Sequence, residues 1–193
     1  MDRIAERGPA QFVADILTQL EARGRVIAAI DGRCGAGKTT LARSLEAEHG
    51  WSVIPLDDFF LRPEQRSPAR YAAPGENVDH ERFLAEVLLP LTRGELVTYR
   101  PFDCVNMALG APAAVPESPV TLIEGSYALH PALFPHYQVT AFLDVDPEEQ
   151  LRRIAARSPE RLEAFRRRWI PLEERYIAAL RPDLRCGHRI LTG

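Results

Sequence analysis

The chain has 193 residues, of which 46% are hydrophobic and 26% are charged, as in one globular domain with a sizeable core. The 24 basic and 27 acidic residues give a formal net charge of −3, which argues against a nucleic-acid-binding protein. No apolar run approaches the ~18 residues of a membrane span, and the first residues, MDRIAERG, lack the apolar stretch of a secretion signal. The three cysteines are far apart, which is typical of reduced thiols. We therefore expect a single cytoplasmic domain over residues 1–193.

Strand-like and helix-like patterns alternate along the chain. Apolar residues at helical spacing predict a helix over 9–23, ended by Gly24, and further helices after Thr39, around 83–91, from 147 and over 159–180. Short apolar runs lie between them at 26–30, 51–56, 120–123 and 139–145, and the first is typical of a strand buried on both faces. The residues 189–191 are a candidate for a last short strand. The stretch 59–77 is rich in proline, arginine and glycine and is expected to be a long surface loop. This alternation predicts an α/β fold with a mainly parallel sheet and helices on both faces.

Polar side chains follow several of these apolar runs directly. The segment Gly32 to Thr39 follows the first run, Asp57 and Asp58 follow the second, and Glu124 and Asp144 lie at the ends of the next two. In parallel sheets, ligands bind at the carboxyl ends of the strands. We therefore expect these residues to share one cleft.

The first of these segments, IDGRCGAGKTT, contains the pattern Gly-x-x-x-x-Gly-Lys-Thr and the only lysine of the chain. In such a phosphate-binding loop, glycines let the backbone wrap an anion, and the N–H groups of the loop and of the next helix point at phosphate oxygens. Lys38 supplies a compact charge to the β- and γ-phosphates, and Thr39 offers a hydroxyl to Mg²⁺. A glycine-rich turn with a chance lysine is the alternative, but the preceding strand and following helix favour nucleotide binding. The predicted nucleotide-binding residues are Gly32, Gly35, Ala36, Gly37, Lys38, Thr39 and Thr40.

The single lysine also narrows the class of nucleotide-binding protein. A GTPase reads its base with an Asn-Lys-x-Asp motif, which this sequence cannot contain. A small-molecule kinase needs a carboxylate beside the acceptor hydroxyl, a second acidic group near Mg²⁺, and mobile cations over the transferred phosphoryl group. The alternating strands and helices around the phosphate loop predict a three-layer P-loop NTPase fold, and the chain length leaves room for a small lid.

Short motifs beyond the phosphate loop resemble those of uridine kinases, in the same order along the chain. LDDFF at 56–60 resembles their Asp-Ser-Phe-Tyr segment, and NVDH at 77–80 resembles their Asn-Phe-Asp-His. Later matches are YRPFD at 99–103, LIEG at 122–125, FLDVD at 142–146 with the arginines that follow it, and IPLEE at 170–174 with Tyr176. The similarity runs over about 27–191 and extends to the wider superfamily that includes pantothenate kinase and phosphoribulokinase.

The resemblance implies roles for two carboxylates and for a lid. Asp57 matches the residue that receives or orients the proton of the acceptor hydroxyl, and a turn cap is its alternative role. Glu124 matches a residue that holds Mg²⁺ through water or positions the acceptor, and it too could instead be a cap. Residues of about 147–170 match the lid, in which Arg153 and Arg157 would neutralise the transferred phosphoryl group alongside Lys38. A solvated arginine face is the alternative for that helix.

The same resemblance assigns the segment 57–110 to the acceptor site. The side chains that it implies for acceptor binding are Asp58, Asp79, His80, Tyr99, Arg100 and Asp103. Structural roles are the alternatives: His80 as a satisfied structural histidine, and Arg100 with Asp103 as a pair that holds a loop.

The stretch 104–109 departs from the uridine kinase pattern. It reads CVNMAL where those enzymes carry His and Arg residues that contact the nucleoside, and Phe60 stands where they have tyrosine. We predict phosphoryl transfer from ATP, with Mg²⁺, to the hydroxyl of a small molecule, with a nucleoside such as uridine as the first candidate. A different metabolite alcohol as acceptor, or a non-catalytic nucleotide-sensing switch, are the alternatives. The expected partners are a nucleotide and a small acceptor, without nucleic acid or membrane, and the oligomeric state stays open.

Overall fold

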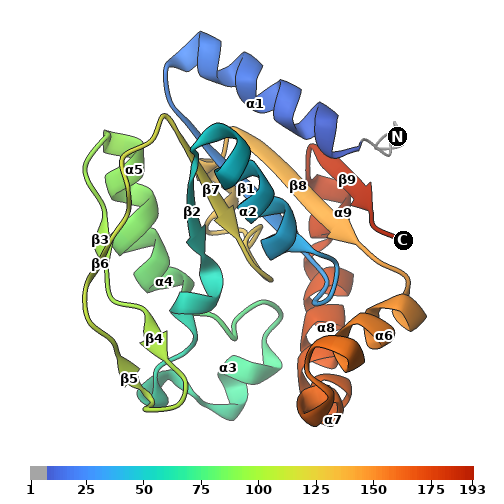
Figure 1. Cartoon of the computed structure of the whole chain (residues 1–193). Helices are drawn as coiled ribbons and strands as arrows, with labels where there is room; N and C mark the ends of the chain where they lie inside the picture. Colours follow the sequence, from blue (N-terminus) through green and yellow to red (C-terminus); the bar gives the residue numbers. More distant parts are fainter. Residues whose placement is uncertain (1–7) are drawn as a thin grey trace.

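The computed structural model describes residues 8–193 and contains a five-stranded sheet with the strand order β2-β7-β1-β8-β9 (Figure 1). The strands are β1 (Val26–Gly32), β2 (Ser52–Pro55), β7 (Val120–Glu124), β8 (Val139–Asp144) and β9 (His188–Leu191). All neighbouring strands of this sheet pair in parallel. The four apolar runs and the short segment at 189–191 therefore form one parallel sheet, as predicted.

The register of the central strands brings their carboxyl ends to one edge of the sheet. Ile30 of β1 lies opposite Glu124 of β7, and Pro55 of β2 lies opposite the same glutamate. Gly32, at the end of β1, lies opposite Leu143 of β8. Because the strands are parallel, the segments that leave β1, β2 and β7 all start at this edge.

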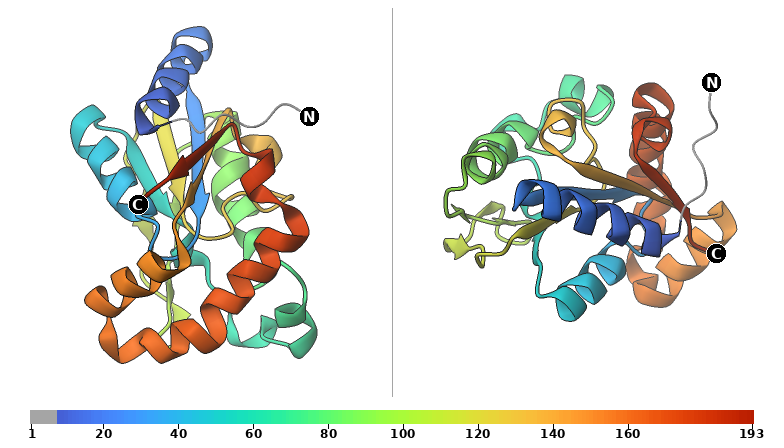
Figure 2. Two further views of the ribbon diagram at one scale, coloured as in Figure 1. Left: turned by 90° about the vertical axis from the view of Figure 1, so that its right-hand side faces the viewer. Right: turned by 90° about the horizontal axis from the view of Figure 1, so that it is seen from above.

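Helices cover both faces of the sheet (Figure 2). The main ones are α1 (Pro9–Arg23), α2 (Lys38–His49), α6 (Pro147–Arg157), α8 (Ile170–Leu180) and α9 (Pro182–Arg185). One core cluster joins α1 and α2 to one face, and a second joins the opposite face to α8 and to the helical segment 80–93. Residues of β1 alternate between the two clusters because successive strand side chains point to opposite faces. This three-layer α/β arrangement is the one that the sequence predicts.

Helix ends follow the signals present in the sequence. Helix α1 ends before Gly24, which has a left-handed φ of 73° and donates its N–H to the Leu20 carbonyl. Helix α6 begins after Asp146, whose side chain accepts the Glu148 N–H, with Pro147 in the first helical position. Within residues 8–193, no helix combines the length and the apolar character that a bilayer crossing requires.

The segment 57–110 contains several short elements. They are 3-10 turns at Leu56–Phe59 and Pro63–Gln65, helices α3 (Pro68–Ala72), α4 (His80–Phe83) and α5 (Leu89–Arg93), and strands β3 (Thr98–Tyr99), β4 (Phe102–Asp103) and β5 (Ala108–Leu109). β3 pairs antiparallel with β6 (Ala113–Ala114), and β4 with β5. The expectation of a loop throughout 59–77 was wrong at α3, where the Ser67 side chain caps the helix and Pro68 occupies its first position.

Two helical stretches widen into a π-helical turn just before a proline. Leu84–Leu88 forms such a turn ahead of Pro90, and Phe165–Trp169 forms one ahead of Pro171. Proline has no N–H to donate and its ring crowds the carbonyl four residues earlier, so the α-helical hydrogen-bond pattern is interrupted. The second turn joins α7 (Leu162–Ala164) to α8, and the helical region predicted over 159–180 is confirmed.

Candidate active site

The loop between β1 and α2 is tight because three glycines adopt conformations that other residues avoid. φ is 142° at Gly32, 78° at Gly35 and 92° at Gly37. A Cβ on Gly32 would lie 2.1 Å from the Leu143 carbonyl oxygen, whereas a Cβ on Gly37 would meet nothing within 4 Å. Close contact with β8 therefore requires glycine at Gly32, and backbone conformation favours it at Gly37. Ala36 is buried in the core beneath the loop.

Lys38 opens α2 and its side chain folds back over the loop. Nζ donates hydrogen bonds to the carbonyl oxygens of Gly32 (2.8 Å) and Arg33 (3.0 Å) and to the hydroxyl of Ser126 (3.2 Å). Only 8% of the residue is exposed. The ammonium group is thus held against the loop backbone, where it can offer a compact positive charge to a phosphate oxygen.

Thr39 and Glu124 form a second polar contact beside the loop. The Thr39 hydroxyl lies 3.1 Å from Oε1 and 3.2 Å from Oε2 of Glu124, which ends β7. Burial raises the pKa of the Glu124 carboxyl, whereas the nearby Lys38 charge lowers it. A hydroxyl and a carboxylate are the hard oxygen ligands that Mg²⁺ prefers, so this pair fits the predicted metal position.

A cavity of about 680 Å³ opens beside the loop at the carboxyl edge of the sheet. Of the residues predicted from the sequence, it is lined by Gly35, Gly37, Lys38, Thr39, Thr40, Asp57, Glu124 and Arg157. Other lining residues had no assigned role, among them Arg66, Tyr71, Tyr127, Arg161, Arg168, Trp169 and Glu173. These residues come from the acceptor segment, the turn after β7, the lid and α8, and they meet only through the tertiary fold.

Asp57 lies in the 3-10 turn directly after β2 and forms part of the cavity wall. Burial raises the pKa of its carboxyl, and the charges of Glu173 and Asp58 raise it further, whereas Lys38 and Arg157 lower it. A carboxylate with a raised pKa is a stronger proton acceptor near neutral pH than an exposed aspartate. Asp57 therefore has a position and a basicity suited to orienting an acceptor hydroxyl.

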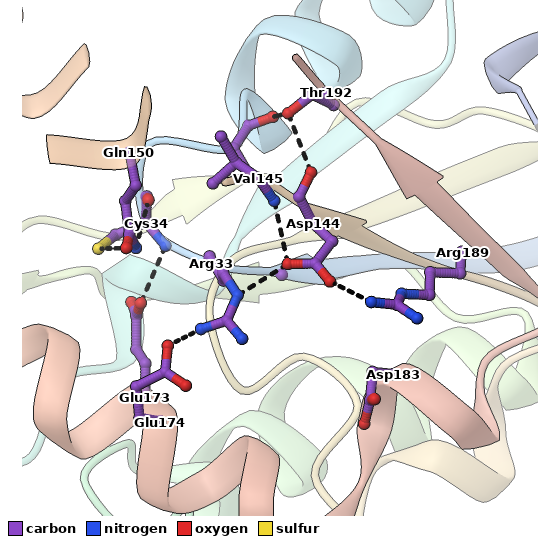
Figure 3. Close-up of polar contacts among 12 residues, drawn as sticks. Arg33, Cys34, Asp144, Val145, Gln150, Glu173, Glu174, Asp183, Arg189 and Thr192 are labelled. Carbon is purple, nitrogen blue, oxygen red and sulfur yellow. Dashed lines mark hydrogen bonds and ion pairs between the residues drawn. The ribbon is translucent and has the colours of Figure 1, made fainter. Parts of the chain in front are cut away.

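Glu173 of α8 contacts the phosphate loop from the side of the lid. Its Oε2 accepts the Cys34 N–H (2.9 Å), and its Oε1 accepts the Ser126 hydroxyl (2.7 Å). Figure 3 shows the Glu173 side chain reaching from α8 to Cys34. The negative charge of Glu173 raises the pKa of the Cys34 thiol, which burial raises even more. One N–H group of the predicted phosphate-binding loop, that of Cys34, therefore already donates a hydrogen bond to a carboxylate.

The two arginines predicted for the lid point to different places. Arg157, at the end of α6, lines the cavity and lowers the pKa of Asp57 through its charge. Arg153 instead donates to Glu149 (2.6 Å) and to the Gly35 carbonyl (3.3 Å), and it does not line the cavity. The catalytic role predicted for Arg153 therefore has less structural support than that for Arg157.

Asp58, Tyr99 and Asp79 lie outside the cavity lining. The Tyr99 hydroxyl donates to Asp58 Oδ2 at 2.6 Å, so the two side chains satisfy each other. Asp79 is buried, caps α4 by accepting the Arg82 N–H, and accepts the Arg62 Nε at 3.1 Å. These contacts hold the acceptor segment together, and direct acceptor binding by the three residues stays a prediction.

Arg100 and Asp103 stabilise opposite ends of the hairpin formed by β4 and β5. Arg100 donates to the carbonyl oxygens of Gly110 (2.7 Å) and Leu109 (3.0 Å) at the open end. Asp103 accepts backbone N–H groups two and three residues further along, in the turn, and these bonds lower its pKa. The two residues thus hold the hairpin, although not by pairing with each other as the alternative proposed, and neither lines the cavity.

His80 belongs to a small cluster outside the cavity lining. Its ring stacks on His130 with centroids 4.1 Å apart and planes inclined by 17°, and Glu76 lies 3.1 Å from His80 Nε2 and 3.4 Å from His130 Nε2. Although these are common metal-ligand types, stacked rings cannot direct both in-plane lone pairs at one ion. The Ala132 N–H also donates to His130 Nδ1, which leaves the proton of the neutral ring on Nε2. We interpret the cluster as structural, the alternative given for His80.

Asp31 is a buried carboxylate for which the sequence motifs predict no role. Its oxygens accept the N–H groups of Gly32, Tyr127 and Leu129 and the hydroxyl of Tyr176. Burial raises the pKa of Asp31, and the hydrogen bonds act in the opposite direction. Asp31 thereby ties the strand before the phosphate loop to the segment after β7 and to α8. The sequence contains one signal for this role: Asp31 directly follows the apolar run 26–30, which places its carboxyl at the end of a buried strand.

Asp144 does not join the predicted cleft. It accepts Arg33 Nε at 2.7 Å and Arg189 Nη2 at 2.6 Å, and these bonds outweigh burial and lower its pKa (Figure 3). Arg33 also pairs with Glu174 of α8. Asp144 therefore anchors the phosphate loop from outside the cavity, which it does not line.

The parallel sheet, the glycine-rich loop after its central strand and the cavity at its carboxyl edge define a P-loop fold. No family model matches the chain. The structure is similar to a possible uridine kinase from Bacillus stearothermophilus, with a TM-score of 0.67, 20% identity, and coverage of 94% of this chain and 97% of that chain. YFH7 from Saccharomyces cerevisiae, a protein proposed to be a P-loop containing kinase with a circular permutation, gives 0.68 at 13% identity, with 96% and 99% covered. At such identities the likeness establishes the fold alone, which is the three-layer P-loop NTPase fold that the sequence predicts.

Proposed function

We propose that the protein transfers the γ-phosphoryl group of ATP to a hydroxyl group of a small molecule. The observation that carries this proposal is the meeting of Lys38, Thr39, Glu124 and Asp57 on one cavity. These residues follow or end three different strands, so the fold alone brings them together. The likeness to P-loop kinase structures supports the same class of reaction.

The phosphate loop and the Thr39–Glu124 pair fit ATP and Mg²⁺. The loop amides and Lys38 would hold the β- and γ-phosphates, and Thr39 with Glu124 would hold the metal. Mg²⁺ supplies neutralisation of the phosphate charge when bound. The ionised form of Glu124 is the one that binds a metal. The nearby Lys38 charge favours this form, whereas burial opposes it.

Asp57 would orient the acceptor hydroxyl and accept its proton. Arg157, on the same cavity, would offer positive charge to the transferred phosphoryl group. We assign residues of about 147–170 to a lid and 57–110 to the acceptor site within one domain, because both segments contribute cavity-lining side chains. Closing such a lid would exclude water, which otherwise competes with the acceptor.

The acceptor is an alcohol, and uridine is the first one to test because of the sequence resemblance. The residues implied by that resemblance to read the nucleoside lie mostly outside the cavity lining, so other metabolite alcohols belong in the same assay. Asp57 separates this proposal from a nucleotide-sensing switch, since a switch has no use for an acceptor-facing carboxylate.

The direct experiment measures ADP release with ATP, Mg²⁺ and a panel of nucleosides, sugars and other alcohols. We expect at least one alcohol to stimulate ADP release and Lys38→Ala to abolish it. Asp57→Asn should lower kcat by about 100- to 10,000-fold while leaving the KM for ATP nearly unchanged, because it removes a proton acceptor and not a phosphate ligand.

Asp58→Asn is the matched control, because Asp58 is the adjacent carboxylate and is held by Tyr99 outside the cavity lining. It should lower kcat far less than Asp57→Asn. The reverse order would move the acceptor role to Asp58. ADP release that no alcohol stimulates would refute the kinase proposal.

A further inference from the structure

Several arginines line the cavity without a carboxylate partner. Within the part of the chain from 8 to 193, no ion pair involves any of the four that line it: Arg66, Arg157, Arg161 and Arg168. Arginines elsewhere are commonly paired, as are Arg33, Arg70 and Arg153. The chain as a whole has a net charge of −3, so this unneutralised positive charge is a local property of the cavity.

Arg66 comes from the acceptor segment 57–110 and is held through only one of its nitrogens. Nε donates to the Leu61 carbonyl at 2.8 Å, and the guanidinium carbon lies 5.5 Å from the centre of the Phe102 ring. Its two terminal nitrogens make no hydrogen bond with residues 8–193. A guanidinium fixed in this way presents its terminal N–H groups as a fork, which matches the paired oxygens of a carboxylate or a phosphate.

Arg161 approaches the same region from the lid. Its guanidinium lies 5.8 Å from the centre of the Phe165 ring, and it forms no hydrogen bond within the described residues. Arg66, Arg161 and Asp57 line the same cavity. Two guanidinium groups without a carboxylate partner therefore share this cavity with the carboxylate that would orient the acceptor hydroxyl.

The phosphate donor does not account for this charge. Lys38, the loop amides, Mg²⁺ and Arg157 already serve the triphosphate in the proposed function. A neutral acceptor would displace water from Arg66 and Arg161 without supplying a negative charge, and desolvation of an unpaired charge is costly. An anionic group on the acceptor would replace that water with charge-assisted hydrogen bonds.

We propose that the phosphoryl acceptor carries an anionic group, a carboxylate or a phosphate, in addition to its hydroxyl, and that Arg66 and Arg161 bind this group. The inference rests on the proposed kinase function and narrows its substrate class. Because one arginine belongs to the acceptor segment and the other to the lid, the same anion would join the two segments over the cavity. Acceptor binding would thereby favour the closed, water-excluding state.

The test compares acceptors that differ by the acidic group alone. Suitable pairs are glycerol and glycerate, pantothenol and pantothenate, uridine and orotidine, and, for phosphate, ribose and ribose 5-phosphate. We expect the acid of at least one pair to have a kcat/KM at least about tenfold above that of its neutral partner, the value of a charge-assisted contact. The carboxylate and phosphate pairs separate the two kinds of anion.

Substitutions then connect the preference to the arginines. Arg66→Gln and Arg161→Gln should each raise the KM for the acid about 10- to 100-fold, while the KM for ATP and that for the neutral partner stay within about twofold. Arg167→Gln is the matched control, because Arg167 is on the same lid segment but pairs with Glu163 and is 81% exposed. It should change none of these constants.

The outcomes separate this inference from the proposed function. Phosphorylation of neutral alcohols with equal or better efficiency than every acid would overturn the anionic acceptor and leave the kinase in place. A rise in the KM for ATP, rather than for the acid, in both Arg66→Gln and Arg161→Gln would also overturn it. If no alcohol, neutral or acidic, stimulates ADP release, both proposals fail.

Discussion

Two buried tyrosine hydroxyls differ in whether they have a hydrogen-bond partner. The Tyr176 hydroxyl donates to Asp31 at 2.7 Å, across 145 residues of sequence. The Tyr137 hydroxyl is buried without a hydrogen-bond partner among residues 8–193. Tyr176 therefore helps to compensate a buried carboxylate, whereas Tyr137 buries an unsatisfied donor.

Tyr176→Phe should destabilise the protein by about 1–2 kcal/mol, because a buried charge loses one of its donors. Tyr137→Phe, the matched control, should change the free energy of unfolding by less than about 0.5 kcal/mol or stabilise the fold, since it removes an unsatisfied hydroxyl. Urea unfolding of the two variants beside the parent measures both values. Equal destabilisation by the two changes would contradict this account.

The site residues that could be predicted from the sequence are those that lie close together along the chain. Gly32, Lys38 and Thr39 lie within eight positions of one another, and their spacing is that of a phosphate-binding loop. Asp31 with Tyr176, and Asp58 with Tyr99, meet only through the tertiary fold. The acceptor residues implied by resemblance were placed by short motifs, and the structure uses most of those side chains to hold the segment together.

At the scale of elements, α8 and the phosphate loop share a contact that involves negative charge. Glu173 accepts hydrogen bonds from Cys34 and Ser126, and Ser126 also accepts a hydrogen bond from Lys38. A triphosphate that enters the loop meets this carboxylate as a like charge. Helix α8 therefore affects how readily the loop accepts an anion.

Glu173→Gln should lower the Kd for ATP about 3- to 10-fold, because the substitution removes the like charge and retains a side chain of the same size. Glu174→Gln is the matched control: Glu174 is the adjacent acid, but it pairs with Arg33. Calorimetric titration with ATP and Mg²⁺ would measure both variants. Weaker ATP binding by Glu173→Gln than by Glu174→Gln would show that the carboxylate supports the loop instead of opposing phosphate.

Elements with a strong repeating pattern were predictable, and short elements were not. Four strands of the parallel sheet match an apolar run, because a strand buried on both faces is apolar along most of its length, whereas the edge strand β9 contains His188 and Arg189 and has only two apolar residues. Helix α3 has five residues and no apolar repeat, so only its capping serine and proline marked it. The π-helical turns also have a sequence signal, a proline inside a helical pattern, although their exact form depends on packing.

For the whole molecule, the cluster of His130, His80 and Glu76 links folding to pH. Burial and the neighbouring His80 lower the pKa of His130 to about 4, against the opposing charges of Glu76 and Glu81. Arg70 pairs with both glutamates, and its bonds to Glu81 lower the pKa of that carboxyl to about 2. An unfolded histidine titrates near pH 6.5, so between pH 6.5 and 4 the unfolded chain binds the extra proton.

Stability should therefore fall as the pH decreases through this range, and His130 should account for about 2 kcal/mol of the loss by pH 4.5. In His130→Asn, the difference in unfolding free energy between pH 7 and pH 4.5 should be smaller than in the parent by about that amount. Urea unfolding at both pH values provides the measurement, and His136→Asn controls for the loss of an imidazole outside the cluster. Identical pH dependence in the parent and His130→Asn would contradict the linkage.

Because Lys38 is the one lysine of the sequence, a reagent that modifies amines can label the nucleotide loop selectively. Apart from the amino terminus, Lys38 is the only amine in the polypeptide, and it is almost entirely enclosed by the oxygens that its Nζ contacts. An acylating reagent therefore has one internal target, Lys38 Nζ. This amine can react only when its hydrogen bonds to the loop and to Ser126 are broken. The mass of the intact chain after brief labelling would separate molecules in which Lys38 Nζ was released from molecules in which the loop or a bound phosphate still held it.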